Sequence, residues 1–245
     1  MSDYKARQLA IDTRLRLGLH STEYLDVDRA VSSLGITCIK RPLESSMSGA
    51  TLKTGRVKAI LVNTAKTLGH QHFTIAHELY HCLYDEHIAS RACKVESFER
   101  ATDSEQVADM FAVHLLMPED GIFNQLRLRG EVAVGRMLAD IVYLEQFFSV
   151  SRRAMCWRLK DLKAITREQS DGWCVNVIQS ARTLGKDIGL YTPTYEKALI
   201  SDYAERAAEA LQKGLITESR YEELLADADL LNAVVEASEE VDVVD

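Results

Sequence analysis

The sequence predicts an α+β fold, with a small sheet in the first third of the chain and helices around it. Short runs rich in β-branched residues occupy positions 36–39, 50–52 and 57–62. Loop-forming residues separate these runs, which favours an antiparallel sheet. From Phe73 onward the apolar residues recur at helical spacing. The 245 residues have an ordinary apolar content, so a substantial core is expected.

The expected helices are amphipathic segments bounded by capping and breaking residues. Gly35 ends one helix, Thr74 is the expected cap of the helix that contains Phe73, Pro118 stops a later one, and Gly214 separates the last two. The remaining bounds follow from the apolar spacing. The expected helical ranges, besides the one from Phe73, are 4–18, 22–34, 103–117, 132–148, 152–162, 198–211 and 217–225.

Composition excludes several classes of protein. The five cysteines are scattered and form no C-x-x-C pair, which predicts reduced thiols and a cytoplasmic location. Residues 1–18 carry charges that interrupt any secretory signal, and no stretch approaches the roughly 20 apolar residues that a membrane span needs. A net charge of −8 disfavours a chain devoted to nucleic acid, although residues 127–168 are locally basic.

The segment from His77 to His81 reads H-E-L-Y-H, which is the H-E-x-x-H pattern. On a helix this spacing puts both imidazoles on one face, where they can share a metal ion. Glu78 then lies near the open coordination position and is the expected catalytic base. The alternative is two surface histidines on an amphipathic helix.

A catalytic zinc ion needs a third protein ligand and keeps one position for water. His87 has the spacing from His81 that metzincins use, but that arrangement requires a glycine at the position of Tyr84. Glu105 and Asp109 form an E-x-x-x-D pair on the next helix. We therefore favour Glu105 as the third ligand, with Asp109 holding the ring N–H of a ligand histidine.

Two blocks of sequence resemble the ImmA/IrrE family of metallopeptidases. The first is F-T-I-A-H-E-L-Y-H at 73–81, preceded by Val62-Asn63, and the second is E-Q-V-A-D-M-F-A-V-H-L-L-M-P at 105–118. The resemblance implies a zincin-like domain, a catalytic Zn²⁺ held by His77, His81 and Glu105, and Glu78 as the base. Tyr80 and His114 depart from the residues that are usual there. Tyr80, His114 and His70 are candidates for stabilising the oxyanion.

Beyond the catalytic part, the resemblance implies a helix–turn–helix-like segment. We expect a metallopeptidase domain at 1–127, this helical segment at 128–168, and a C-terminal helical region with an acidic tail at 169–245. The basic excess of the middle segment favours an anionic contact, whereas its apolar residues fit a packed helical hairpin equally well. Whether it binds DNA stays open.

The family resemblance also implies a function and a partner. The expected activity is zinc-dependent cleavage of a helix–turn–helix repressor in a stress-response, mobile-element or toxin–antitoxin module. Two alternatives remain: a transcription regulator with a structural zinc, and a toxin or partner protein that acts by binding alone. An extended substrate is expected to add to the strand at 57–62.

Overall fold

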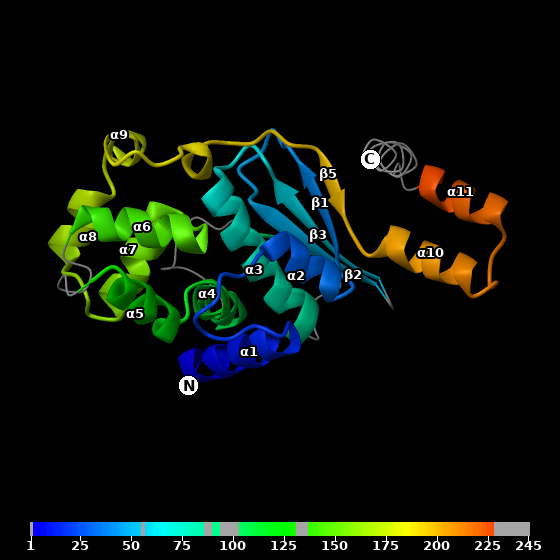
Figure 1. Cartoon of the computed structure of the whole chain (residues 1–245), viewed down its shortest axis with the longest axis horizontal. Coiled ribbons are helices and arrows are strands. Elements are labelled where there is room, and N and C mark those ends of the chain that lie inside the picture. The colour runs from blue at the N-terminus through cyan, green and yellow to red at the C-terminus, as the bar shows by residue number, and fades with distance from the viewer. Residues whose placement is uncertain (1, 55–56, 86–89, 94–102, 131–136, 228–245) are drawn as a thin grey trace, which may run out of the picture. The chain divides into compact units, whose positions relative to one another are not determined.

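The computed structural model describes residues 2–54, 57–85, 90–93, 103–130 and 137–227. The chain divides into two compact units, Met1–Ile200 and Ser201–Asp245, which are treated separately here. Unit 1 contains a five-stranded sheet and the helices that surround it (Figure 1). The α+β class expected from the sequence is therefore confirmed.

The sheet is mixed, with the strand order β4-β2-β3-β1-β5. β2 (Gly49–Thr54) pairs antiparallel with β3 (Val57–Asn63), as expected, but β1 (Thr37–Arg41) pairs with β3 in parallel. The expectation of a purely antiparallel sheet is wrong at this pairing because β3 lies between β1 and β2. The buried side chain of Asn63 fixes the connection from β1 to β2: its Oδ1 accepts from Leu43 N–H and its Nδ2 donates to Met47 O.

The outer strands come from later parts of the chain. β4 (Ser90–Cys93) pairs antiparallel with β2, and β5 (Ala198–Ile200) pairs antiparallel with β1. β3 is thus the central strand, so the expectation that an extended substrate adds to residues 57–62 is wrong. The helix expected at 198–211 starts later than predicted. Its first three residues are apolar and form β5 instead, because they can pair with the edge of the sheet.

Most helices of unit 1 follow the expected apolar periods. The helix Glu119–Leu128 was not expected, and neither were two short helices and a 3₁₀ turn after residue 166. The helices of unit 1 are α1 (Ser2–Arg16), α2 (Val27–Ser33), α3 (Leu68–Tyr84), α4 (Asp103–Leu116), α5 (Glu119–Leu128), α6 (Leu138–Phe148), α7 (Arg152–Asp161), α8 (Arg167–Trp173), α9 (Val177–Thr183) and η1 (Gly189–Tyr191).

The helix that carries the H-E-x-x-H pattern begins earlier than the sequence suggests. α3 starts after Thr67, and Thr74, the expected cap, lies inside it and bonds its hydroxyl to His70 O. The polar residues between 67 and 72 hid this first turn, because their apolar spacing is weak. α3 packs against β2 and β3 on one side and against α4 on the other (Figure 1).

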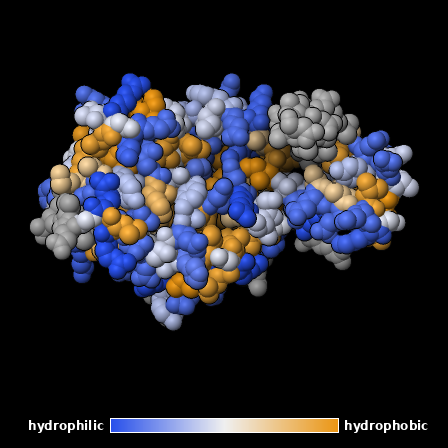
Figure 2. Space-filling model, viewed as in Figure 1, coloured by the Kyte–Doolittle hydropathy of each residue, from blue (hydrophilic) through white to orange (hydrophobic). Residues whose placement is uncertain are grey.

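The core of unit 1 is continuous from the sheet to the later helices. Phe111 of α4 is fully buried, and its ring contacts those of Tyr80 and Tyr84 on α3. α6 and α7, joined by residues 149–151, bury Phe148 and Leu159 in the same core. The helix–turn–helix identity of this pair stays a prediction. On the face seen in Figure 2, hydrophilic and hydrophobic residues are interspersed over unit 1.

Unit 2 contains the helical pair α10 (Tyr203–Gln212) and α11 (Glu218–Asp227), which pack against each other. Gly214 lies between them with a φ of 68°, a left-handed conformation that favours glycine. Among the described residues of the chain, none of the helices combines the length and the apolar character that a bilayer crossing requires.

Candidate metal centre

α3 positions three polar side chains in the interior of unit 1. His77, Glu78 and His81 are all almost completely buried, with at most 2% of their surface exposed. The neighbouring positions Ile75, Ala76 and Leu79 are fully buried apolar residues that fix the helix in the core. Burying polar groups is unfavourable unless they have partners, so their arrangement indicates a site.

Glu105 of α4 completes a group of three donors. The Nε2 atoms of His77 and His81 lie 3.3 Å apart, and the Glu105 oxygens lie 3.3 Å from His77 Nε2 and 3.4 Å from His81 Nε2. Ligand atoms about 2.0–2.1 Å from a tetrahedral zinc ion are separated by about 3.3 Å. A different Glu105 oxygen faces each histidine, and the three residues form a cluster whose spacing is compatible with a bound metal ion.

Two carboxylates on the far sides of the imidazoles set the direction in which the rings point. Asp109 Oδ1 lies 2.8 Å from His77 Nδ1, and Asp85 Oδ2 lies 3.2 Å from His81 Nδ1. Ser104 Oγ donates to Asp85 at 2.6 Å and holds that carboxylate in place. When a metal ion is bound, each Nδ1 carries the proton and each Nε2 turns its lone pair toward the ion.

The charge state of Glu105 suits a metal ligand. Hydrogen bonds with His77 and then His81 lower the pKa of its carboxyl far below the usual range, and they outweigh the opposing effect of burial. The carboxylate is therefore ionised at neutral pH. Two neutral imidazoles and one carboxylate are a donor set that zinc accepts, with one position left for water or substrate.

Glu78 is held from the side of the sheet. Thr51 Oγ1 of β2 donates a hydrogen bond of 2.6 Å to Glu78 Oε2, and both residues are buried. Glu78 Oε1, by contrast, is buried with no hydrogen-bond partner among the described residues. One carboxylate oxygen is thus fixed, while the other is available to accept a proton from a ligand in the site.

Gly49 allows the close approach of β2 to α3. A Cβ at this position would lie 2.5 Å from Thr74 Cγ2, 2.9 Å from Leu61 O and 3.3 Å from Glu78 Oε1. Only a residue without a side chain fits there. The absence of a Cβ thus brings the strand that carries Thr51 within hydrogen-bonding distance of Glu78.

The candidates for oxyanion stabilisation lie in different surroundings. His114 bonds to Asp3 Oδ1 at 2.8 Å and to Arg158 at 3.3 Å, so its ring is engaged between α1 and α7. Tyr80 packs its ring in the core. His70 lies two turns before His77 on α3 and contacts Ser48 Oγ at 2.9 Å. His87, the alternative third ligand, lies outside the described residues.

The sequence predicted the residues that the structure groups together as candidate metal ligands. Three residues that support them were not predicted. Asp85 could have been predicted as a partner of His81, because it follows His81 by four residues and so lies on the same face of the helix. Thr51 and Gly49 carried no such signal, since their place in the site depends on how β2 packs against α3.

A family model described as the IrrE N-terminal-like domain, which represents a family of peptidases, matches residues 31–160. The match covers more than half of the chain and includes β1–β3, α3 and α4, and therefore every residue of the candidate metal centre. No curated protein matches the chain.

Proposed function

The chain belongs to the ImmA/IrrE family of metallopeptidases, and from this premise we propose that it is a zinc-dependent endopeptidase that cleaves a partner helix–turn–helix repressor. The observation that supports the zinc most strongly is the convergence of His77, His81 and Glu105, whose nearest nitrogen and oxygen atoms lie 3.3–3.4 Å apart. We assign the ligands to His77, His81 and Glu105.

The catalytic steps fall to groups around these ligands. When bound, zinc supplies Lewis-acid chemistry, by which it acidifies a bound water and polarises the scissile carbonyl. Glu78 Oε1 accepts the proton of the attacking water and later returns it to the leaving amine. Thr51 keeps the carboxylate from rotating between the two steps through its bond to Oε2.

The substrate is a flexible segment that can become extended. β4 is at the edge of the sheet, and its outer side has no strand partner among the described residues. A peptide can add to such an edge by backbone hydrogen bonds. β4 pairs with β2, the strand that carries Thr51, so a peptide on this edge would be two strands from Thr51.

Unit 2 provides a means of selecting one partner. Residues 201–245 contain thirteen carboxylates and three basic residues. A DNA-binding repressor presents a basic surface, which an acidic region attracts electrostatically. Docking of the repressor on unit 2 would raise the local concentration of its interdomain linker at the metal.

The direct test is to mix the purified chain, zinc and the repressor encoded beside its gene, and to follow cleavage by mass spectrometry. We expect one cut in the linker of the repressor, no cut in unrelated folded proteins, and no cut in the presence of a chelator. An intact repressor under all conditions would contradict the proposal. Cleavage that the chelator stops but that persists with Glu78→Gln would mean that another group takes the proton.

A truncation tests the selection step separately. Residues 166–200 belong to unit 1, since β5 pairs with β1 and Leu68 N–H bonds to Thr192 O, so the cut must follow Ile200. The chain 1–200 should cleave a short linker peptide as fast as the full chain does, and the whole repressor more slowly. Equal rates on both substrates would argue against docking on unit 2.

The binding-only alternatives make a different prediction. A toxin, partner or DNA-binding regulator with a structural zinc would keep its biological effect when Glu78 is replaced by Gln, since the metal ligands are untouched. A peptidase should lose its biological effect in the Glu78→Gln variant. The same variant therefore separates the hypotheses in cells.

A further inference from the structure

A large cavity lies in unit 1 among α7, α8 and α9, and none of the three metal ligands lines it. Its volume is about 1470 Å³, above the 300–1,000 Å³ that is typical of small-molecule sites. Most of its lining comes from residues 151–191, and the family match ends at residue 160. The peptidase reaction described above uses none of these residues.

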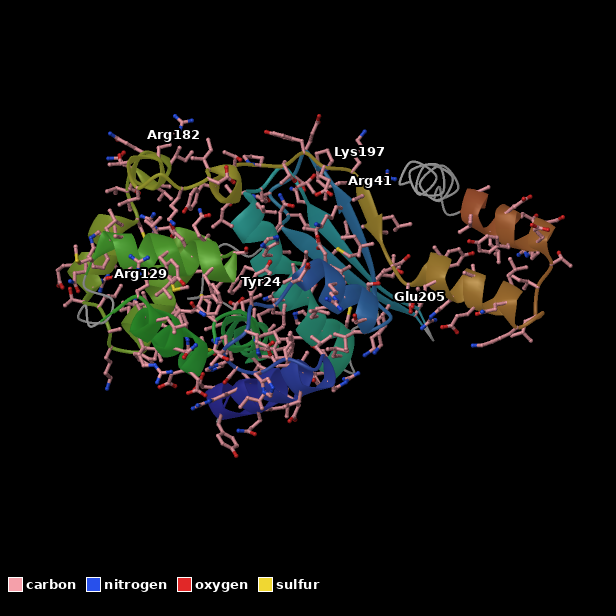
Figure 3. The ribbon with its side chains drawn as sticks, viewed as in Figure 1. Tyr24, Arg41, Arg129, Arg182, Lys197 and Glu205 are labelled. Atoms are coloured by element: carbon pink, nitrogen blue, oxygen red, sulfur yellow. The ribbon has the colours of Figure 1, made fainter. Side chains whose placement is uncertain are left out.

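The lining of the cavity is strongly basic. Arg153 and Lys160 of α7, Arg167 of α8 and Arg182 of α9 line it, and among the described residues of the lining Asp171 is the one carboxylate. Arg182 extends outward from α9 (Figure 3). In a chain with a net charge of −8, this concentration of cations creates a local positive potential that favours an anion.

These cations differ in how they are paired. Arg152, which also lines the cavity, is buried and forms a bidentate pair with Glu145, with distances of 2.5 and 2.7 Å. Its charge is therefore balanced within the protein. Arg153 and Lys160 have no ion pair among the described residues, and both side chains are exposed. The charges of Arg153 and Lys160 are therefore available to bind a ligand.

The start of α7 adds to the same potential. Ser151 caps this ten-residue helix, and its first turn carries Arg152 and Arg153 and no acidic residue. Cations at the positive end of a helix dipole are unfavourable, because acidic residues are the ones stabilised there. A bound anion would reverse this repulsion and gain from the dipole.

An aromatic surface lies between the two unpaired cations. Trp157 follows Arg153 by four residues and precedes Lys160 by three, so the three side chains form one row on the cavity side of α7. Its indole is half-buried and lines the cavity. A planar ring flanked by cations suits a ligand that combines phosphate with an aromatic base.

We propose that this cavity binds a small phosphorylated ligand of the nucleotide class, with Arg153 and Lys160 on the phosphate and Trp157 against the base. A compact ligand is favoured over a nucleic acid because the unpaired cations and the indole gather at one cavity lined by three helices, whereas a polymer requires an extended track for its backbone. The inference is independent of the peptidase activity and of its substrate.

Calorimetric titration of the zinc-loaded full chain tests the proposal, with ADP, inorganic phosphate and adenosine as probes. We expect ADP to bind more tightly than either fragment. The double variant Arg153→Ala/Lys160→Ala should weaken ADP binding at least about tenfold. The matched variant Lys5→Ala/Arg16→Ala, which removes two exposed cations from α1, should bind as the wild type does. Both double variants keep the proposed zinc ligands, so any contact between ADP and zinc would contribute equally to their affinities.

A third variant separates the base from the phosphate. Trp157→Leu should weaken ADP and leave inorganic phosphate unchanged, and the fold is checked by circular dichroism. Absence of ADP binding at millimolar concentration, or equal binding by the two double variants, would overturn the proposal. Much tighter binding of a single-stranded or duplex oligonucleotide than of ADP would also overturn it, because the site would then be a nucleic-acid surface.

Discussion

Thr51 Oγ1 and Glu78 Oε2, from β2 and α3, are joined by a hydrogen bond of 2.6 Å in a buried part of unit 1. This bond leaves Glu78 Oε1 as the carboxylate oxygen without a partner among the described residues. The sheet therefore orients the carboxylate that we propose as the catalytic base, and it does so from a strand more than twenty residues earlier in the chain.

Replacing Thr51 tests this orientation. Thr51→Val keeps the shape and removes the hydroxyl, so we expect kcat to fall about tenfold to a hundredfold while zinc content stays the same. Thr51→Ser restores the donor and should recover most of the rate. A merely structural role for Thr51 predicts the opposite order, since valine preserves the packing better than serine does.

Glu78→Gln removes the proton acceptor without changing the size of the side chain. General-base catalysis contributes about 10²- to 10⁴-fold, so we expect a loss of that order in the cleavage rate. The melting temperature and zinc stoichiometry should match those of the wild type. A rate close to that of the wild type would mean that another group takes the proton.

The carboxylates behind the imidazoles should tune the affinity for zinc. Asp109→Asn and Asp85→Asn each weaken the contact with a ring N–H, and such changes typically cost about 10- to 100-fold in affinity. Competition with a chromophoric chelator measures this. Asp12→Asn on the exposed surface of α1 is the control. An unchanged zinc affinity in both Asp109→Asn and Asp85→Asn would show that the two imidazole rings do not depend on these carboxylates for their orientation.

The pair between Glu145 and Arg152 should matter for stability. Both residues are buried, and Tyr191 Oη also donates to Glu145 Oε1 at 2.5 Å. Glu145→Leu strands a buried guanidinium, which costs about 3–5 kcal/mol of unfolding free energy. The double variant Glu145→Leu/Arg152→Met should regain much of that loss. Urea denaturation measures both.

The exposed pair between Glu209 and Lys213 is the matched comparison. Its side chains are more than half exposed, so solvent screens the pair and Glu209→Ala should leave the denaturation midpoint nearly unchanged. A loss as large as that of Glu145→Leu would show that the charge itself, and not its burial, determines the cost.

The elements that carry the metal centre could be read from the sequence for a physical reason. α3 and α4 have apolar residues at helical spacing, and the i, i+4 rule places His77 beside His81 without knowledge of the fold. Pro118 ends α4 within two residues of the expected position. Local chemistry of this kind is visible in one sequence.

The rest depended on contacts between distant segments. The parallel pairing of β1 with β3 and the antiparallel pairing of β5 with β1 are tertiary contacts. The alternation of apolar and polar residues along a strand does not reveal which strands are its neighbours. For the same reason Thr51 and Gly49 were not recognised as parts of the site. The start of α3 was misjudged because its first turn is polar.

The most direct test of the account is zinc K-edge absorption spectroscopy of the chain and of two variants. The account predicts four nitrogen or oxygen ligands at about 2.0–2.2 Å, two of them imidazoles, and no sulfur near 2.3 Å. Glu105→Ala should lose one of these ligands or the metal itself, while Glu119→Ala, at the start of α5, should match the wild type. A sulfur ligand, or an unchanged spectrum for Glu105→Ala, would contradict the assignment of His77, His81 and Glu105.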